Sequence, residues 1–462
     1  MTTQIFQAST LYGTATLAAA LDSDRFGPAD RRILLVCNNA ATPETTPGLD
    51  EMPGFARLRE RFDEVVSWNG VISPFHPGGW APRPDDVPLW ERHLRLLWRL
   101  GDDDVELAVE SIQVNPARAI AQIFTGAPVT VYADGLMSYG PTRNKIDPLV
   151  GTRIERLLHL DLVPGLTPVL LTEFGVGPEL VPDGAFLKVV AELAELPGTG
   201  GELSGAGGEL SGAGGDASGT GGGPALLLGQ YLSALDILTA GEEEALHLRM
   251  LRGAVALGHT RLVFKPHPSA PAHWSRTLER EARRLGAGLT VLDTPVLAEV
   301  LYQRMRPALV VGCFSTALLT ASAMYGLPVA RTGTGTLLDR LTPYENSNRV
   351  PVTVVDALLP DLDDRAAVAA QRPGMAVTAL DELVRAVSYA MQPKIHPSLR
   401  PAAERYLAAH LDAHTRRYFK RRRLTSLALP GGVPAKLAFV PRNATVRRVA
   451  RRARSLGRSA GR

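Results

Sequence analysis

The chain has 462 residues, of which 45% are hydrophobic and 21% charged, an ordinary composition for a globular protein with two or three domains. No run of 18 apolar residues occurs, so we expect no membrane-spanning helix. The opening MTTQIFQAST lacks the basic segment and apolar core of a signal peptide. The only cysteines, Cys37 and Cys313, give neither a disulfide framework nor a zinc cluster, and this usage predicts a cytoplasmic protein.

Charge is distributed unevenly along the chain. The net charge is +3, but residues 414–462 contain 15 Lys and Arg and no Asp or Glu, which leaves 35 basic and 47 acidic residues elsewhere. Nucleic-acid binding is not favoured, because no recognition fold accompanies this basic segment. One interpretation is a peripheral contact with the anionic inner face of a membrane. The alternative is a disordered, solubilising tail.

The first part of the chain alternates strand-like and helix-like segments. Strands are expected at residues 4–10, 31–39, 63–68, 105–113 and 128–135. Helices are expected at residues 11–23, 89–100 and 116–126. This alternation predicts βαβ units and a parallel sheet.

A segment of different composition follows. Residues 197–223 are mostly Gly, Ser and Ala, and GELSGAG occurs in tandem at 201–207 and 208–214. It has too little apolar surface to fold, so we interpret it as a flexible linker that only tethers its neighbours.

Alternation resumes after this linker. Strands are expected at residues 224–233, 261–268, 288–293, 307–315 and 327–331. Helices are expected at residues 240–257, 295–304, 316–326, 380–391 and 401–423. The sequence therefore predicts an α/β protein with two Rossmann-like, doubly wound domains that face a cleft, followed by C-terminal helices.

These segments give predicted boundaries for five parts of the chain. In order they are an N-terminal acceptor-side domain, the linker, a nucleotide-binding domain, C-terminal helices and a basic tail, at residues 1–196, 197–223, 224–390, 391–425 and 426–462. Ligands of doubly wound sheets bind beyond the carboxyl ends of the strands, so the cleft between the domains is the expected site.

The first candidate motif is YADGLMSYG at 132–140, where a strand ends. Asp134 is placed at the carboxyl end of this strand, and Gly135 permits a sharp turn or a close approach of another group. The alternative is a turn carboxylate that only caps the next segment.

The second motif is FKPHPS at 264–269, in which two prolines bracket His267 directly after an apolar strand. Proline cannot continue a ladder, so the chain leaves the sheet here and holds His267 rigidly. Lys265 and a protonated His267 can both donate to a phosphate, and a phosphate would raise the pKa of His267. The alternative is a structural or solvated histidine.

The third motif is VGCFSTALLTA at 311–321, where Ser315 and Thr316 open a helix after a strand that ends near Gly312. Their hydroxyls and the free N–H groups of the first turn can form an anion site. The alternative is an ordinary N-cap, worth about 1 kcal/mol. A hydrolase nucleophile is not supported, because Gly-x-Ser-x-Gly is absent, and no glycine-rich segment forms a P-loop.

Taken together, the order of the three motifs resembles that of bacterial sialyltransferases, most closely the polysialyltransferase-like family of capsule-type enzymes (the alpha-2,8-polysialyltransferase family). That family has an acidic-acidic-Gly, a His-Pro and a Ser-Ser/Thr motif in this order. Here they are ADG at 133–135, HP at 267–268 and ST at 315–316, and LHLDLVPGLTPVLL at 158–171 is similar to the stretch that follows the first. The resemblance covers roughly residues 4 to 390.

The resemblance implies a GT-B glycosyltransferase that takes sialic acid from CMP-sialic acid and transfers it to a glycan hydroxyl. The reaction would be an inverting displacement without a catalytic metal or any cofactor beyond the donor. Asp134 would deprotonate the acceptor and His267 would assist the departing phosphate. The implied donor-binding residues are Lys265, His267, Pro268, Ser315 and Thr316.

One position departs from the family pattern. Ala133 occupies the place of the first acidic residue, which usually serves as the base, so Asp134 is the only carboxylate left in the motif. Loss of a general base typically costs 10²–10⁴-fold in rate. The alternatives are therefore a GT-B enzyme with another nucleotide sugar, or a degenerate nucleotide-binding protein at the membrane without turnover.

Overall fold

The computed structural model describes residues 1–133, 135–196, 222–267, 272–292 and 294–433. Its first half contains a seven-stranded sheet in the order β3-β2-β1-β4-β5-β6-β7, in which every neighbouring pair is parallel. The strands are β1 Thr2–Ala8, β2 Arg31–Val36, β3 Glu64–Ser67, β4 Asp104–Glu110, β5 Val129–Tyr132, β6 Ile154–His159 and β7 Gly177–Leu180. The carboxyl ends of all seven strands consequently meet at one edge.

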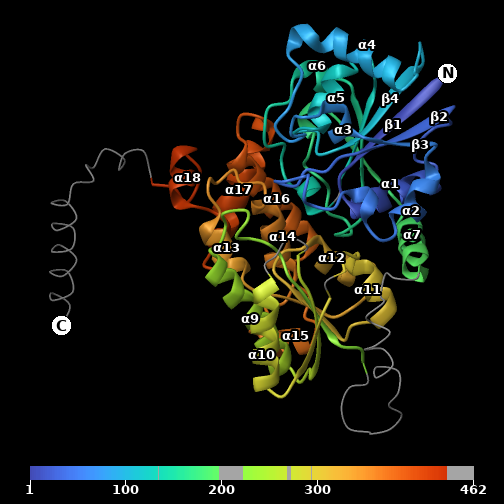
Figure 1. Cartoon of the computed structure of the whole chain (residues 1–462). Coiled ribbons are helices and arrows are strands. Elements are labelled where there is room, and N and C mark those ends of the chain that lie inside the picture. The colour runs from blue at the N-terminus through green and yellow to red at the C-terminus, as the bar shows by residue number, and fades with distance from the viewer. Residues whose placement is uncertain (134, 197–221, 268–271, 293, 434–462) are drawn as a thin grey trace, which may run out of the picture.

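Helices cover both faces of this sheet (Figure 1). They are α1 Leu11–Asp22, α2 Phe55–Leu58, α3 Trp68–Ile72, α4 Val87–Leu97, α5 Ala117–Ile123, α6 Pro148–Gly151 and α7 Asp183–Glu195. Successive side chains of β1 point to opposite faces, so Phe6 packs in the core cluster that contains Phe186 of α7, whereas Ile5 packs in the cluster that contains Trp68 of α3. Burial on both faces explains why the central strands are almost continuously apolar.

The second half repeats the pattern with a five-stranded parallel sheet in the order β10-β9-β8-β11-β12. Its strands are β8 Ala225–Leu228, β9 Arg261–Lys265, β10 Gly288–Val291, β11 Leu309–Gly312 and β12 Val329–Arg331. Its helices are α9 Ala240–Ala256, α10 Ala272–Arg284, α11 Ala298–Met305, α12 Thr316–Ala323, α13 Thr334–Arg340, α14 Arg349–Leu358 and α15 Arg365–Ala369. Both sheets begin in their centre and reverse direction at the first strand, which is the doubly wound order.

The last helices connect the two halves. They are α16 Val377–Met391, α17 Arg400–His410 and α18 Arg421–Ser426, and in Figure 1 the first two lie beside the junction of the blue-to-teal half and the yellow-green half. Directly after α16, Gln392 Nε2 donates to the carbonyl of Arg143 at 2.7 Å, and Arg143 Nη1 donates to Ser347 Oγ at 3.1 Å. These bonds hold the first half against the C-terminal part of the chain.

The predicted α/β class with two parallel sheets is confirmed, and most of the predicted strands are shorter than expected. The strand predicted at 4–10 ends at Ala8, because Thr10 instead caps α1 by accepting from Gly13 N at 2.9 Å. The helix predicted at 401–423 is broken after His410 by a 3-10 turn at Thr415–Tyr418. The sequence analysis missed several elements: β6, β7, α7, α10, α13, α14 and α15.

The domain boundaries at residues 196, 390 and 425 stay predictions. The linker prediction for 197–223 lies almost wholly outside the described residues, and so does the basic tail from residue 434 onward. None of the helices in the described ranges is long and apolar enough to cross a membrane.

Candidate functional site

The candidate site is a pocket of about 410 Å³ between the two sheets, which we call the inter-sheet pocket. From the first half it is lined by residues that follow β1 and β5: Thr10, Tyr12, Gly135, Leu136 and Met137. From the second half it is lined by Gln230, Lys265, Val296, Leu297, Ala298, Glu299, Phe314, Ser315, Thr316, Ala317 and Pro351. Residues at the carboxyl ends of β1, β5, β8, β9 and β11 therefore meet here, as expected for two doubly wound sheets.

The first and third motifs touch each other across this pocket. Leu136 N lies 3.4 Å from Thr316 Oγ1 and donates to it. Gly135 has φ of 155°, and a Cβ built there would lie 2.5 Å from Thr316 Oγ1. Only glycine satisfies both the backbone angle and this close approach.

The environment of Ala133 bears on the departure from the family pattern. Ala133 is 8% exposed and packs in the apolar cluster beneath β5, and its N–H donates to the carbonyl of Leu158 at 2.8 Å. A carboxylate in this apolar setting would lose its hydration without compensation. Asp134, the predicted base, lies outside the described residues.

Lys265, at the end of β9, is a cation that lines the inter-sheet pocket. Burial lowers the pKa of its ammonium group, while the charge of Glu299 acts in the opposite direction. Glu299 lines the same pocket, accepts from Thr320 Oγ1 at 2.6 Å, and has a pKa raised by its burial. A desolvated lysine of this kind gains from the arrival of an anion.

His267 lies two residues beyond Lys265 and is exposed. It is not among the residues that line the pocket in the part of the chain described; its ring centroid lies 6.1 Å from that of Tyr231, which packs edge-on against Trp274. Desolvation and the nearby charge of Lys265 lower the pKa of His267, so the neutral ring predominates at neutral pH. Pro268 lies outside the described residues.

Ser315 and Thr316 begin α12 in different ways. Ser315 is the N-cap of α12, and its Oγ accepts from Ala317 N at 3.3 Å. The ordinary N-cap, which the sequence analysis gave as the alternative for this motif, therefore describes Ser315 in this structure. Thr316 instead directs its hydroxyl toward the first half of the molecule. Gln230 Oε1 accepts from Phe314 N at 2.9 Å and fixes the turn before the helix.

The sequence analysis missed several residues at this edge, among them Tyr12, Gln230 and Glu299. It also missed Glu110, a 4%-exposed carboxylate that ends β4 and accepts from Gln7 Nε2 at 3.2 Å and Tyr132 OH at 3.3 Å. The available signal was an acidic residue at the end of a strand. Within the described ranges, no group of three or more His, Cys, Asp or Glu side chains is placed to hold a metal ion.

Comparisons with known proteins give the following similarities. No curated protein matches the chain significantly in sequence. Among solved structures, the GT-B domain of a sialyltransferase from Photobacterium damselae is 12% identical, with a TM-score of 0.42, and the match covers 77% of this chain and 96% of that one. Glycyrrhiza uralensis UGT73P12 in complex with glycyrrhetinic acid 3-O-monoglucuronide is 11% identical, with a TM-score of 0.43 and coverages of 89% and 98%.

A third solved structure, UDP-GlcNAc 2-epimerase from Methanocaldococcus jannaschii, is 10% identical, with a TM-score of 0.44 and coverages of 84% and 100%. The two parallel, doubly wound sheets that meet at one pocket are the GT-B architecture expected for this chain. The family model of the alpha-2,8-polysialyltransferases (POLYST) matches residues 4–334. Because this match spans most of the chain, the protein belongs to the alpha-2,8-polysialyltransferase family and is a glycosyltransferase.

Proposed function

We propose that this glycosyltransferase moves sialic acid from CMP-sialic acid to a hydroxyl of a glycan acceptor, with inversion and without a metal or cofactor. The observation that carries the proposal is the inter-sheet pocket, where Lys265, Ser315 and Thr316 lie together beside Gly135. Family membership supports a sialic acid donor. The pocket contains a cation and hydroxyl groups that can bind the phosphate of a nucleoside monophosphate. CMP carries one phosphate, so one lysine and one helix start can balance its charge.

The phosphate of the donor is proposed to bind between Lys265 and the start of α12. A phosphate oxygen would accept from the Lys265 ammonium group, whose pKa is lowered by burial, and would stabilise its charged form. The Ser315 and Thr316 hydroxyls and the first-turn N–H groups would complete the contact.

His267 is proposed to assist the leaving group. The acceptor oxygen forms a bond to the anomeric carbon of sialic acid while the bond from that carbon to the phosphate oxygen of CMP breaks. The negative charge of the donor would raise the pKa of His267 from its lowered value, so the ring would take up a proton when the donor binds. The protonated ring could then donate to the departing phosphate.

Asp134 is proposed to take the proton of the acceptor hydroxyl. Ala133 packs among apolar groups, so the position used by other members of the family does not present a carboxylate to the pocket here. Asp134 therefore has to act alone in this motif. If Asp134→Asn leaves turnover unchanged, this assignment is wrong.

Calorimetric titration of CMP into the wild type and into His267→Ala tests the donor site. We expect clear CMP binding that is lost or strongly reduced in His267→Ala, with no comparable binding of UDP or GDP. The control is His273→Ala, because His273 is an exposed histidine on the nearby α10. CMP binding that does not depend on His267 would break the motif assignment.

Two alternative functions are distinguished by the same titration together with an assay of sugar transfer. Preferential binding of UDP or GDP would indicate a GT-B enzyme with another nucleotide sugar. Tight CMP binding without any transfer would indicate a degenerate nucleotide-binding protein, the alternative raised by the alanine at position 133.

We further propose that the enzyme associates peripherally with the cytoplasmic face of the membrane through its basic tail. The described residues before the tail already carry exposed cations: Arg416, Arg421 and Arg422. Cosedimentation of the full chain with phosphatidylglycerol vesicles should exceed that with phosphatidylcholine vesicles and should weaken with salt. Equal binding to both would contradict the proposal.

A further inference from the structure

The loop that directly follows β8, residues 229–233, is here called the β8 loop. Gln230 of this loop is half-buried and lines the inter-sheet pocket together with Lys265 and the start of α12. None of the three sequence motifs includes the β8 loop, although it borders the cavity in which two of them meet.

A buried carboxylate holds the backbone of the β8 loop. Glu243, on α9, is fully buried, and its two oxygens accept from Leu232 N at 2.6 Å and from Ser233 N at 2.8 Å. The side chain of Leu232 is itself buried in the apolar core. Hydrogen bonds from backbone N–H groups to a carboxylate are among the stronger ones in proteins, so the far end of the loop is firmly fixed.

The near end of the loop is fixed against the strand that carries Lys265. Gly229 N donates to the carbonyl of Lys265 at 2.9 Å. A Cβ built on Gly229 would lie 2.9 Å from Phe264 Cζ, so a side chain at this position would push the loop away from β9. The ring of Tyr231 then lies at a centroid distance of 6.1 Å from the ring of His267. One side of the β8 loop therefore lies against the segment that contains the His-Pro motif.

A contact on the other side orients the amide of Gln230. Its Oε1 accepts from Phe314 N at 2.9 Å, directly before Ser315, the N-cap of α12. Because a backbone N–H only donates, the amide atom next to Phe314 is the oxygen, and Nε2 is the atom that can donate elsewhere. Among the described residues, Nε2 donates to no protein group. The loop thus presents an oriented N–H donor at the inter-sheet pocket.

The surroundings of this amide favour an anionic oxygen as its acceptor. Lys265 and the first turn of α12 line the same cavity, and both can only donate hydrogen bonds through their N–H groups. Glu299 also lines the cavity, but its carboxyl group accepts from Thr320 Oγ1 at 2.6 Å and its burial raises its pKa, which favours the neutral form. An oxygen that accepts from several donors at once is typically one that carries negative charge.

We propose that Gln230 is a further donor-binding residue, whose Nε2 donates to an anionic oxygen of CMP-sialic acid, and that Glu243 positions it by holding the β8 loop. The inference rests on the proposed function and adds a recognition residue to its donor site. CMP-sialic acid has two anionic groups, the phosphate and the carboxylate of the sugar, and each can accept from an amide N–H. Because the amide is oriented before the donor arrives, little side-chain freedom is lost on binding.

The variant Gln230→Glu tests this contact. It keeps an oxygen that can accept from Phe314 N and replaces the Nε2 donor with a second carboxylate oxygen, which repels an anion. We expect the KM for CMP-sialic acid to rise about tenfold or more. A parallel loss of CMP affinity in calorimetry would identify the phosphate as the partner, and unchanged CMP affinity would identify the carboxylate of the sialic acid. If neither the KM nor the CMP affinity changes, Gln230 only fixes the turn before α12 and the proposal is wrong.

A second variant separates the hydrogen bond from the added charge. Gln230→Met removes the amide without introducing a charge, and we expect it to raise the same KM severalfold. A wild-type KM in Gln230→Met would show that Gln230→Glu acts by repulsion alone, and this result would also overturn the proposal.

Gln371→Glu is the matched control for the exchange of an amide for a carboxylate. Gln371 Oε1 also accepts from a backbone N–H, that of Val329 at 3.1 Å, but Gln371 does not line the inter-sheet pocket. Its CMP affinity and its KM for CMP-sialic acid should equal those of the wild type. Equal losses in Gln371→Glu and Gln230→Glu would indicate general damage and contradict the proposal.

The positioning role of Glu243 is tested by combining two variants. Glu243→Gln keeps one acceptor for the loop and loses the other, so the KM for CMP-sialic acid should rise severalfold. In the double variant Glu243→Gln/Gln230→Glu the KM should equal that of Gln230→Glu alone, because no donor then remains to be positioned. Additive losses would show that Glu243 does not act through Gln230.

The outcomes keep this inference apart from the proposed function. If the wild type binds CMP and uses CMP-sialic acid while both Gln230 variants behave like it, the inference is wrong and the donor site stands. If the wild type neither binds CMP nor turns over CMP-sialic acid, the proposed function fails and the role of Gln230 fails with it.

Discussion

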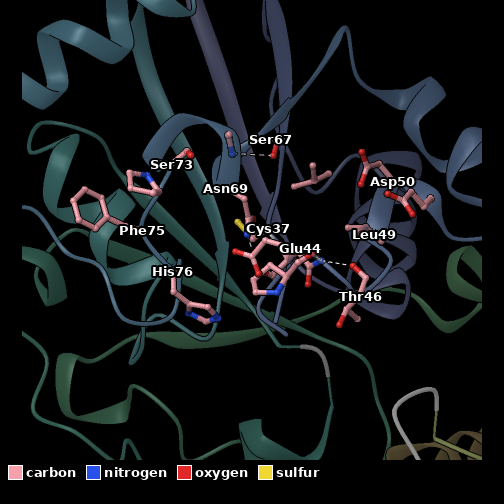
Figure 2. Close-up of a pocket in the computed structure, with 17 residues that line it drawn as sticks. Cys37, Glu44, Thr46, Leu49, Asp50, Ser67, Asn69, Ser73, Phe75 and His76 are labelled. Carbon is pink, nitrogen blue, oxygen red and sulfur yellow. Dashed lines mark hydrogen bonds between the residues drawn. The ribbon is translucent and has the colours of Figure 1, made fainter. Parts of the chain in front are cut away.

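Two pockets at the carboxyl edge of the first sheet differ in charge and in construction. The inter-sheet pocket contains Lys265 and the start of α12, and both halves of the chain build its walls. A second cavity, of about 360 Å³, lies at the carboxyl ends of β2 and β3 and is here called the β2–β3 pocket (Figure 2). It is lined by the carboxylates Glu44, Asp50 and Glu51 and belongs to the first half alone. One edge of one sheet thus borders a pocket that contains a cation and a pocket that contains carboxylates.

This difference indicates which of the two pockets suits the donor phosphate. Carboxylates repel a phosphate from the acid-lined β2–β3 pocket, and we expect the half-buried Lys265 to favour one in the inter-sheet pocket. Contact between the halves builds the proposed donor pocket, because Gly135 and Thr316 lie close together across it. Changes at that contact should therefore affect CMP binding first, and changes around Asn38, which lines the β2–β3 pocket, should leave CMP binding unaltered.

The largest effect is expected for Gly135→Ala. The added Cβ would meet Thr316 Oγ1 at 2.5 Å in a backbone conformation with φ of 155°, so the side chain of Thr316 or the backbone at residue 135 would have to shift. We expect a loss of about 100-fold or more in transfer rate, since misplacement by about 1 Å has this effect. Gly175→Ala is the control, because Gly175 also has positive φ, 74°, but nothing lies within 4 Å of its added Cβ. Similar losses in both variants would show that backbone strain alone matters.

A smaller loss is expected for Lys265→Met, measured as CMP affinity by calorimetry. Removal of one charge-assisted hydrogen bond costs about 1.5–3 kcal/mol, or roughly 10- to 150-fold. Burial lowers the pKa of Lys265. As the pH rises, the affinity of the wild type for CMP should therefore begin to fall at a lower pH than it would with a lysine of ordinary pKa. Lys188→Met, at an exposed position of α7, should change neither property. Unaltered CMP affinity in Lys265→Met would remove the lysine from the donor site.

The pH dependence of CMP binding tests the proposed role of His267. Its pKa is lowered in the free protein, and a bound phosphate would raise it, so binding should take up a proton near neutral pH. CMP affinity should then be greatest at acid pH and fall as pH rises through the pKa of the bound state, by severalfold. Calorimetry in buffers of different ionisation enthalpy measures the number of protons taken up when CMP binds. His267→Ala should abolish the uptake, and an unchanged uptake would assign it to another group.

Much of this architecture was predictable from local patterns. The apolar runs of β1 and β11 are buried on both faces. Such continuous apolar runs are typical of strands in a parallel sheet, so these strands could be recognised in the sequence. The short β7, Gly177–Leu180, was missed because GPEL contains proline and glycine and gains its place only by pairing with β6. This strand forms because it pairs with β6, and the periodicity of its own sequence does not indicate that pairing.

The candidate site was predictable only in part, for a similar reason. Strand ends and helix starts identify Lys265, Ser315 and Thr316, and the structure brings these three into one pocket. Glu299 and Gln230 escaped notice because nothing near them in the sequence sets them apart from surface residues. Only the fold turns their side chains into a pocket. The acid-lined β2–β3 pocket escaped notice because Glu44, Asp50 and Glu51 lie in a segment whose shape depends on hydrogen bonds of Asn38 with Thr46 and with Asn69 of α3.

The smallest effect is expected for Asn69→Ala, which removes the reciprocal amide contacts with Asn38. Each lost hydrogen bond costs about 0.5–1.5 kcal/mol, so the loop that carries Glu44 should loosen without unfolding the protein. The midpoint of thermal unfolding should fall slightly, and calorimetry should show the wild-type Kd for CMP. Thr45→Ala is the matched control, because the hydroxyl of Thr45 forms its hydrogen bonds within the same loop, with Thr42. If Asn69→Ala weakens CMP binding as much as Lys265→Met does, the β2–β3 pocket takes part in donor binding, and the charge contrast between the two pockets does not determine where the phosphate binds.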